Sequence, residues 1–298
     1  MKVKYIVRKN DNYLNINDVL NLEFKISSRL KLKLIKNNCI LLNGTSCDTR
    51  LKVKENDIIT VNFDYEEANS NIVPKKMNLN IIYEDDWLLA IDKPAGFATH
   101  PSILHYKDSI SNGVKYYFDK IGLKKKIRPI NRLDLNTSGL IIFAKCEYIQ
   151  DCLNKQMQNR NFVKEYLALA SGIFKNKKGT INLPIARKEG SIIERCISSC
   201  GQPSITHYEV LEESNTYSLI KCTLETGRTH QIRVHMASFE HPLIGDTLYG
   251  NSSNLIDRHA LHCYKLKFIH PITKKRVNLV AQLPEDMNSL IISRTHIF

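Results

Sequence analysis

The chain has 298 residues, enough for one large domain or two smaller ones. Its 43% hydrophobic and 24% charged residues are typical of a globular protein and exclude a fibrous or mostly disordered chain. Lys and Arg number 43 against 30 Asp and Glu, which gives a formal net charge of +13. Such an excess favours a polyanionic partner over a small neutral one, although a basic surface without a ligand is the alternative.

The cysteines and the amino terminus indicate the compartment. The eight cysteines form no CxxC pair, so we expect reduced thiols rather than a disulfide framework or a typical zinc site. Residues 1–13 contain no apolar run of signal-peptide length, and no other stretch approaches the roughly 18 apolar residues of a membrane span. We therefore expect a cytoplasmic protein without a membrane partner.

Residues 1–65 are predicted to form a small domain. Residues 25–36 hold five basic residues and no acid, and Ser27 or Ser28 could cap a helix there, although the alternation over residues 30–34 also fits a strand. The apolar residues 40–42, an Asn-Gly turn and the alternating run 59–63 complete a helix-plus-hairpin unit. Its basic side chains could contact RNA phosphates or could simply be solvated.

A linker and a larger domain are predicted to follow. Residues 66–77 are polar, lack periodicity and contain Pro74, which is typical of a linker. In residues 78–298, strand-like runs mix irregularly with helical patterns such as residues 147–158, which favours an α+β domain with a mixed, largely antiparallel sheet and flanking helices. The runs expected to form strands are 79–83, 87–91, 140–145, 163–170 and 218–224.

Several familiar chemistries lack their signatures. The sequence has no phosphate-binding loop, no dinucleotide-binding GxGxxG, no HExxH and no GxSxG, so we expect neither a nucleotide cofactor nor a metal. Ten histidines are present, but His230 and His235 lie five residues apart, which does not place both on one helical face for a shared metal. Structural or RNA-contacting roles are expected for the histidines.

One carboxylate stands out by its position. Asp134 lies between an Arg-Leu pair and an Asn-Thr-Ser-Gly turn, directly before an apolar strand, which would place it on a rigid loop at the edge of the sheet. From the residues alone it could instead stabilise the turn by accepting backbone N–H bonds. Further along, Ile232, Met236 and Phe239 have helical spacing and predict a stripe that faces the core, next to Arg233.

Four ordered segments resemble the motifs of the RluA-type pseudouridine synthases. Residues 132–140, Arg-Leu-Asp-Leu-Asn-Thr-Ser-Gly-Leu, resemble the motif that carries the required aspartate. Residues 92–96, Asp-Lys-Pro-Ala-Gly, resemble the first motif, and residues 163–168, Val-Lys-Glu-Tyr-Leu-Ala, the tyrosine motif. Residues 224–236 are similar almost throughout to the third motif. The order of elements in residues 1–65 resembles the αL RNA-binding domain of the ribosomal protein S-four type, which members of this family carry ahead of the catalytic domain.

The resemblance implies conversion of uridine to pseudouridine in structured RNA, with Asp134 as the catalytic carboxylate. It would either add covalently or remove the ribose 2′ proton. Because burial raises a carboxyl pKa, an ionised aspartate needs a cationic partner, and the resemblance gives this role to Arg233. It implies that Tyr166 stacks on the flipped uracil and that Arg132 fills the vacated space or contacts the RNA backbone. Asn131 stands where histidine is usual, which should change local hydrogen bonding rather than abolish activity.

The residues leave alternatives open. Tyr166 could be a core tyrosine of an alternating strand, and Arg233 a surface arginine. We prefer large-subunit ribosomal RNA as the substrate of a monomeric enzyme, with transfer RNA, or a non-catalytic ribosome-assembly factor, as alternatives. A nucleoside-cleaving glycosidase is disfavoured because no second carboxylate lies next to Asp134. The charge divides into +5 on residues 1–65 and +8 on the remainder, which fits an RNA held by both parts.

Overall fold

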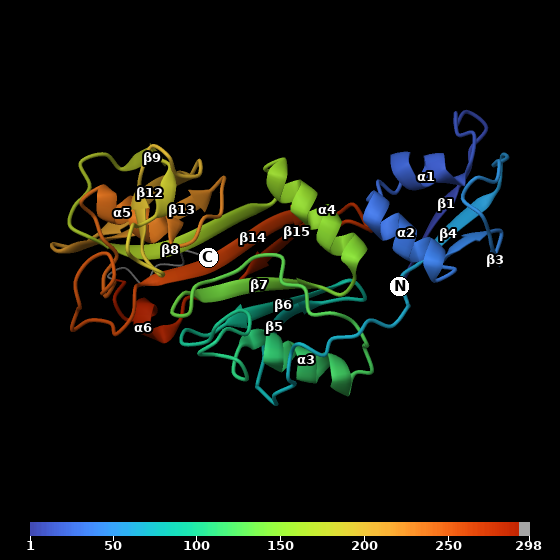
Figure 1. The fold of residues 1–298 in the computed structure, drawn as a ribbon. Coiled ribbons are helices and arrows are strands. Elements are labelled where there is room, and N and C mark those ends of the chain that lie inside the picture. Colours follow the sequence, from blue (N-terminus) through green and yellow to red (C-terminus); the bar gives the residue numbers. More distant parts are fainter. Residues whose placement is uncertain (292–298) are drawn as a thin grey trace.

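The computed structural model describes residues 1–291, which form a small amino-terminal sheet domain and a larger body (Figure 1). The last seven residues of the predicted catalytic domain, 292–298, lie outside the described part. The small sheet is antiparallel in the order β1-β4-β2-β3. Its elements are β1 (Lys2–Ile6), α1 (Ile16–Leu22), α2 (Ser28–Lys36), β2 (Ile40–Leu42), β3 (Thr45–Ser46) and β4 (Ile58–Asn62).

Helix α2 confirms the predicted basic helix and shows that the strand alternative was wrong. Leu30 and Leu34, four residues apart, are fully buried, whereas Leu32 between them is 69% exposed, as a helix with one apolar face requires. Ser27 occupies the N-cap position, but its hydroxyl makes no capping bond and instead donates to Asp151 of the body. The side chain expected to cap the helix therefore helps to attach the small domain.

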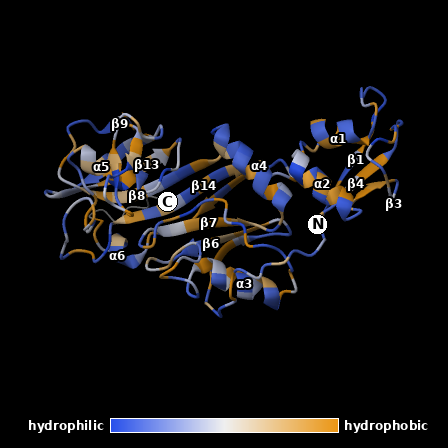
Figure 2. Cartoon of the chain, viewed as in Figure 1, coloured by the Kyte–Doolittle hydropathy of each residue, from blue (hydrophilic) through white to orange (hydrophobic). Residues whose placement is uncertain are grey.

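The larger domain is built on one nine-stranded sheet in the order β5-β6-β7-β14-β8-β13-β12-β9, with β15 paired to β14. Within residues 1–291 only β7 and β14 pair in parallel, so the prediction of an α+β fold with a mixed, largely antiparallel sheet and flanking helices is confirmed. Hydrophobic residues run along strands β6 and β7 (Figure 2). The strands are β5 (Asn80–Glu84), β6 (Leu88–Lys93), β7 (Ser138–Ala144), β8 (Val163–Ser171), β9 (Lys178–Asn182), β12 (Ile205–Glu213), β13 (Tyr217–Leu224), β14 (Leu261–Ile269) and β15 (Arg276–Val280).

Helices and a separate hairpin surround this sheet. Strands β10 (Ile185–Arg187) and β11 (Arg195–Ile197) form the hairpin, and α5 (Gln231–Ser238) contacts β11 and β12. Helix α4 (Glu147–Gln158), which has the predicted bounds, contacts β7 and β14. The remaining helices are α3 (Ile110–Lys120) and α6 (Glu285–Asn288). None of the helices in the described part of the chain has the length and apolar character needed to cross a lipid bilayer.

The two halves of the large sheet meet at a close approach between β7 and β14. Their parallel pairing consists of His262 with Ser138 and Cys263 with Gly139. Gly139 has a left-handed φ of +111°, and a Cβ added there would lie 2.3 Å from the Cys263 carbonyl oxygen. Only glycine fits both the backbone conformation and the space. This junction lies directly after the loop that carries Asp134.

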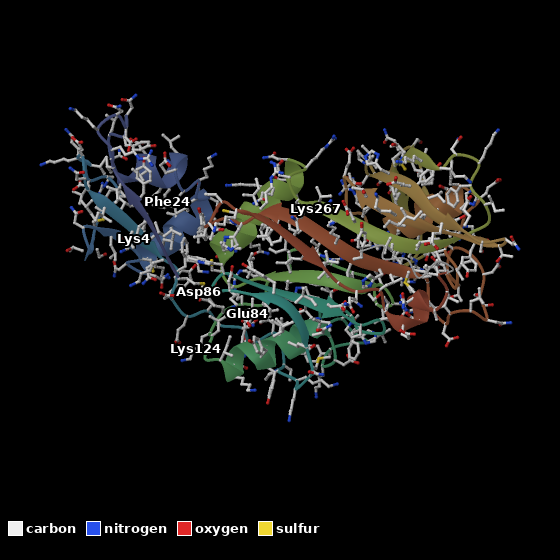
Figure 3. The ribbon with its side chains drawn as sticks, turned by 180° about the vertical axis from the view of Figure 1, so that it is seen from behind. Lys4, Phe24, Glu84, Asp86, Lys124 and Lys267 are labelled. Atoms are coloured by element: carbon white, nitrogen blue, oxygen red, sulfur yellow. The ribbon has the colours of Figure 1, made fainter. Side chains whose placement is uncertain are left out.

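The small domain packs against the body rather than hanging from a free tether. The Phe63 and Tyr148 rings stack with centroids 5.0 Å apart. Lys33 of α2 and Arg128 of the body share the carboxylate of Glu67, at 2.6 and 2.7 Å. Residues 66–77, the predicted linker, contain no helix or strand. Figure 3 shows the contact from behind, with Lys4 and Phe24 on the small domain and Glu84 and Lys124 on the body.

Candidate active site

The loop before β7 holds Asp134 in a framework of buried hydrogen bonds. Asn131 donates to the Leu140 carbonyl and accepts from the Ile142 N–H, which pins the loop to β7. The Nζ of Lys93, fully buried, donates at 2.9 Å to the carbonyl of Leu135, directly after Asp134, and to two other main-chain carbonyls. Burial lowers the pKa of Lys93 to about 7. The carboxylate of Asp134 therefore sits on a rigid support.

The Asp134 carboxylate is free of the turn. Within residues 1–291 its hydrogen-bonding role in the turn is confined to its main-chain oxygen, which accepts from the Thr137 N–H at 3.2 Å. Its side chain is 27% exposed and faces two cationic or ionisable groups. Arg233 Nη1 lies 3.7 Å and His230 Nε2 lies 3.9 Å from Asp134 Oδ2. The alternative of a purely turn-stabilising carboxylate does not fit this geometry.

Arg233 has a second, stronger partner that sequence reasoning missed. Its Nε and Nη2 donate to the two carboxylate oxygens of Asp246, each at 2.8 Å, and the Asp246 side chain is fully buried. Burial raises the pKa of Asp246, but the Arg233 guanidinium outweighs this and lowers it below the ordinary value. Asp246 thus orients Arg233, whose remaining nitrogen points to Asp134. No spacing rule in the sequence connects Asp246 to Arg233.

The helix that carries Arg233 corrects one prediction. Ile232 and Met236 are buried as expected, but Phe239 is 42% exposed. The reason is that α5 ends at Ser238, so Phe239 is the C-cap residue, outside the regular helix. Arg233 itself is 7% exposed, which rules out the surface-arginine alternative.

Tyr166 lies on β8, opposite the Asp134 loop. It is 6% exposed, and burial raises the pKa of its hydroxyl well above the ordinary value, so the phenol stays neutral. Its hydroxyl is hydrogen-bonded to the Cys263 thiol. Tyr166 combines the core packing expected from its alternating strand with a position on the cleft wall.

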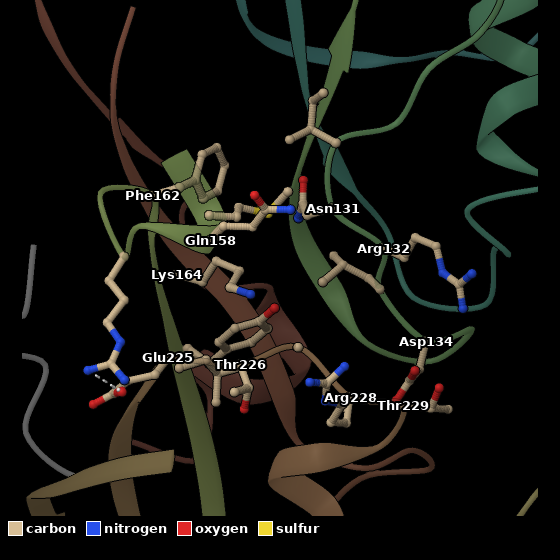
Figure 4. A pocket seen from close by; sticks show the side chains of 17 residues that line it. Asn131, Arg132, Asp134, Gln158, Phe162, Lys164, Glu225, Thr226, Arg228 and Thr229 are labelled. Atoms are coloured by element: carbon tan, nitrogen blue, oxygen red, sulfur yellow. Dashed lines mark ion pairs between the residues drawn. The ribbon is translucent and has the colours of Figure 1, made fainter. Parts of the chain in front are cut away.

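A cleft of about 650 Å³ brings Arg132, Asp134 and Tyr166 together. Figure 4 shows Lys164, from β8, and Arg228 beside the same space, together with the exposed Arg132. A smaller adjoining pocket is lined by Asp134, Tyr166 and Arg233. The residues predicted to form the site therefore converge on Asp134. The cations Arg132, Lys164 and Arg228 suit an anionic ligand.

Arg258 and His259, which follow the motifs in the sequence, support the loop that carries Asp134. No sequence pattern predicted this role. Arg258 Nη1 donates to the Asn136 carbonyl at 3.0 Å and its Nε to Asp286 at 2.7 Å. His259 Nε2 is hydrogen-bonded to Thr137 Oγ1 at 2.8 Å, and burial lowers the pKa of His259 to about 3. Within the described residues, no group of three His, Cys, Asp or Glu side chains could hold a metal ion.

Known proteins are similar to this chain in sequence and in fold. The family profile described as RNA pseudouridylate synthase matches residues 87–238. An uncharacterised RNA pseudouridine synthase of Bacillus subtilis, YhcT, is 38% identical over 274 residues, covering 91% of this chain and 90% of that protein. Ribosomal large subunit pseudouridine synthase D of Pasteurella multocida is 35% identical, covering 89% and 86%. The solved structure of human RNA pseudouridylate synthase domain containing 1 superposes with a TM-score of 0.57 at 27% identity, covering 69% of this chain and 83% of that one.

Proposed function

The chain belongs to the RNA pseudouridylate synthase family, and we propose that it isomerises uridine in large-subunit ribosomal RNA with Asp134 as the catalytic carboxylate. The observation that carries the assignment is the convergence of Asp134, Arg233 and Tyr166 on the smaller pocket that adjoins the cleft. The reaction breaks the bond from ribose to N1 of the uracil, turns the base and forms a bond from ribose to C5, while C5 loses its proton and N1 gains one. It needs no net oxidation or phosphate transfer.

In this proposal the Asp134 carboxylate acts in its ionised form. It either adds covalently to the nucleotide or removes the ribose 2′ proton, and both routes need an anion. Arg233, held by Asp246, supplies the positive charge that favours this anion. Asp246 fixes the Arg233 side chain, and backbone hydrogen bonds fix the loop that carries Asp134, before the substrate binds. Little reorganisation of these two groups is therefore needed during the reaction.

The cleft must receive a uridine that has left its base stack. Extrusion of a base costs a few kcal/mol, and stacking on an aromatic ring returns roughly 1–3 kcal/mol. We assign Tyr166 to the stacking contact because its ring lines the cleft next to Asp134. Arg132, exposed on the cleft beside Asp134, is assigned to the vacated space or the RNA backbone.

Ribosomal RNA is favoured as the target by the relative from Pasteurella multocida, whose name specifies the large ribosomal subunit, and transfer RNA is the second candidate. We infer that the protein acts as a monomer in the cytoplasm, where its eight free cysteines remain reduced. Pseudouridine maps of RNA from cells with and without the protein test the target. A missing pseudouridine in transfer RNA only would overturn the preference for ribosomal RNA.

The small domain is proposed to bind RNA through the part of α2 that does not face the body. Lys33 is engaged by Glu67 and Glu147, whereas Arg29 and Lys36 are exposed. Replacing both with Ala should weaken RNA binding and reduce the salt slope by about one for each lost phosphate contact. The control is Lys120→Ala on the body. Unchanged affinity and slope would show that the basic helix is merely solvated.

Tritium release from RNA labelled at C5 of uridine tests the role of Asp134. Asp134→Asn should bind the RNA and release no tritium, while Asp86→Asn, which alters an exposed aspartate outside the cleft, should behave as the wild type. Equal release by wild type and Asp134→Asn would overturn the assignment of Asp134. No release by the wild type from ribosomal and transfer RNA would favour the non-catalytic assembly factor, and release of free uracil would favour a glycosidase.

A further inference from the structure

A chain of two hydrogen bonds connects the β10–β11 hairpin to His230, whose imidazole faces Asp134. The Arg195 N–H, on β11, donates to the hydroxyl oxygen of Tyr249 at 2.8 Å. The same oxygen lies 2.8 Å from Nδ1 of His230, and Nε2 on the other side of that imidazole lies 3.9 Å from Asp134 Oδ2. His230 and Tyr249 have no role in the proposed function so far, yet they face the reacting carboxylate.

The donors along this chain determine which imidazole nitrogen of His230 carries the proton. A main-chain N–H can only donate, so Tyr249 accepts from Arg195 and has its own proton to give. The near acceptor for that proton is Nδ1 of His230. A neutral imidazole with Nδ1 as acceptor is protonated at Nε2. The Nε2–H then points to Asp134, whereas the other tautomer would set a nitrogen lone pair against a carboxylate oxygen.

The surroundings keep the His230 imidazole neutral. Burial lowers its pKa, the Asp134 carboxylate raises it, and the guanidinium groups of Arg233 and Arg195 lower it again, with a net decrease. The Arg233 guanidinium also lies 5.0 Å from the centroid of the Tyr249 ring, so charge and ring are packed together. His230 has a left-handed backbone with φ of 58°, a strained conformation of the kind that concentrates at functional positions.

We propose that His230 and Tyr249 are positioning residues for pseudouridine formation: Tyr249 holds His230 as the Nε2–H tautomer, and this N–H is the second donor, beside Arg233, that orients the Asp134 carboxylate. The inference rests on the proposed function of Asp134. The distance of 3.9 Å is longer than a hydrogen bond, and such contacts often tighten only when the substrate binds. An approach of His230 Nε2 to Asp134 Oδ2 by about 1 Å completes this hydrogen bond.

The tautomer can be read without an activity measurement. Long-range ¹H–¹⁵N spectra of the full-length protein labelled at histidine nitrogens separate protonated from unprotonated ring nitrogens, and His230→Gln identifies the His230 signals by their loss. We expect a protonated Nε2 and an unprotonated, hydrogen-bonded Nδ1, with the Nδ1 resonance shifted in Tyr249→Phe. Protonated Nδ1 in the wild type would overturn the inference.

Steady-state kinetics test the effect on Asp134. Tyr249→Phe keeps the ring against Arg233 and removes only the hydroxyl, so kcat should fall roughly three- to tenfold with KM unchanged, as for loss of one hydrogen bond. His230→Leu should lower kcat about a hundredfold. His230→Gln, whose amide can place an N–H near the Nε2 position, should recover most of that loss. A merely structural role for His230 would not distinguish Gln from Leu in this way.

Two comparisons separate failure of this inference from failure of the proposed function. Tyr217→Phe removes a hydroxyl that donates to the Leu290 carbonyl, away from Asp134, and should keep the wild-type kcat. Normal kcat in both Tyr249→Phe and His230→Leu, with an active wild type and an inactive Asp134→Asn, would overturn this inference alone. A wild type without activity would overturn the proposed function and this inference with it.

Discussion

Gly139→Ala should destabilise the body because of where Gly139 lies, at the junction of β7 and β14. The new Cβ would stand 2.3 Å from the Cys263 carbonyl oxygen and 2.6 Å from its nitrogen, both main-chain atoms of a paired strand. Ordinary contact begins at 3.4 Å, so the two strands must separate by about 1 Å. Neither atom belongs to a flexible side chain that could turn away.

The expected cost has two parts. An alanine in a left-handed conformation costs about 1–2 kcal/mol. Overpacking between paired strands adds about 1–3 kcal/mol, so the free energy of unfolding should fall by about 2–5 kcal/mol. Gly122 provides the matched control, since its φ is +72° but nothing lies within 4 Å of a Cβ added there. Gly122→Ala should therefore lose only the first part.

Urea unfolding followed by the fluorescence of Trp87, the single tryptophan, measures both variants in the body itself. The difference between Gly139→Ala and Gly122→Ala isolates the close approach from the backbone strain. Equal losses of stability in the two variants would show that β7 and β14 can separate at no cost, which contradicts this prediction.

Three further predictions concern charge and buried polar groups. Burial lowers the pKa of His262 to about 4, so the unfolded chain takes up the proton first as pH falls below about 6.5, and stability is lost from there towards pH 4. Between pH 7 and pH 5 protonation of this residue should lower the free energy of unfolding by about 2 kcal/mol. In His262→Asn the urea midpoint should therefore depend less on pH over that range, and an unchanged pH dependence would contradict this. Glu67→Gln deprives Lys33 and Arg128 of their shared carboxylate and should cost about 3 kcal/mol in urea unfolding. The exposed neighbour Glu66, replaced by Gln, should cost less than about 1 kcal/mol, and equal costs would refute a buried role for Glu67. Asn131→Ala leaves two buried main-chain groups without partners and should cost about 2–4 kcal/mol by thermal or urea unfolding, whereas a neutral result would mean that the loop does not depend on Asn131.

The elements with strong local patterns were predictable from the sequence. The predicted bounds of α4 match the structure, and β7 was recognisable as an apolar run after a turn. Asp134 was found through its motif, and its loop does lie at the end of a buried strand. These features depend on residues close in sequence, where periodicity and turn chemistry act directly.

The pairings between distant residues were not predictable. Arg233 was assigned to Asp134, but the bidentate partner is Asp246, thirteen residues away across a loop. Lys33 was counted among cations free for RNA, yet it faces Glu67 of the predicted linker. In both cases the tertiary fold selects among several possible partners of a charged side chain, and the sequence contains no spacing that reveals the choice.

Complete nucleoside analysis distinguishes isomerisation of a uridine by Asp134 from cleavage of its base. Ribosomal RNA from cells lacking the protein is incubated with wild-type protein or Asp134→Asn and then digested completely to nucleosides. We expect the wild type to convert uridine to an equal amount of pseudouridine without free uracil, and Asp134→Asn to form none. Pseudouridine formed equally by both proteins, or free uracil released by the wild type, would contradict it.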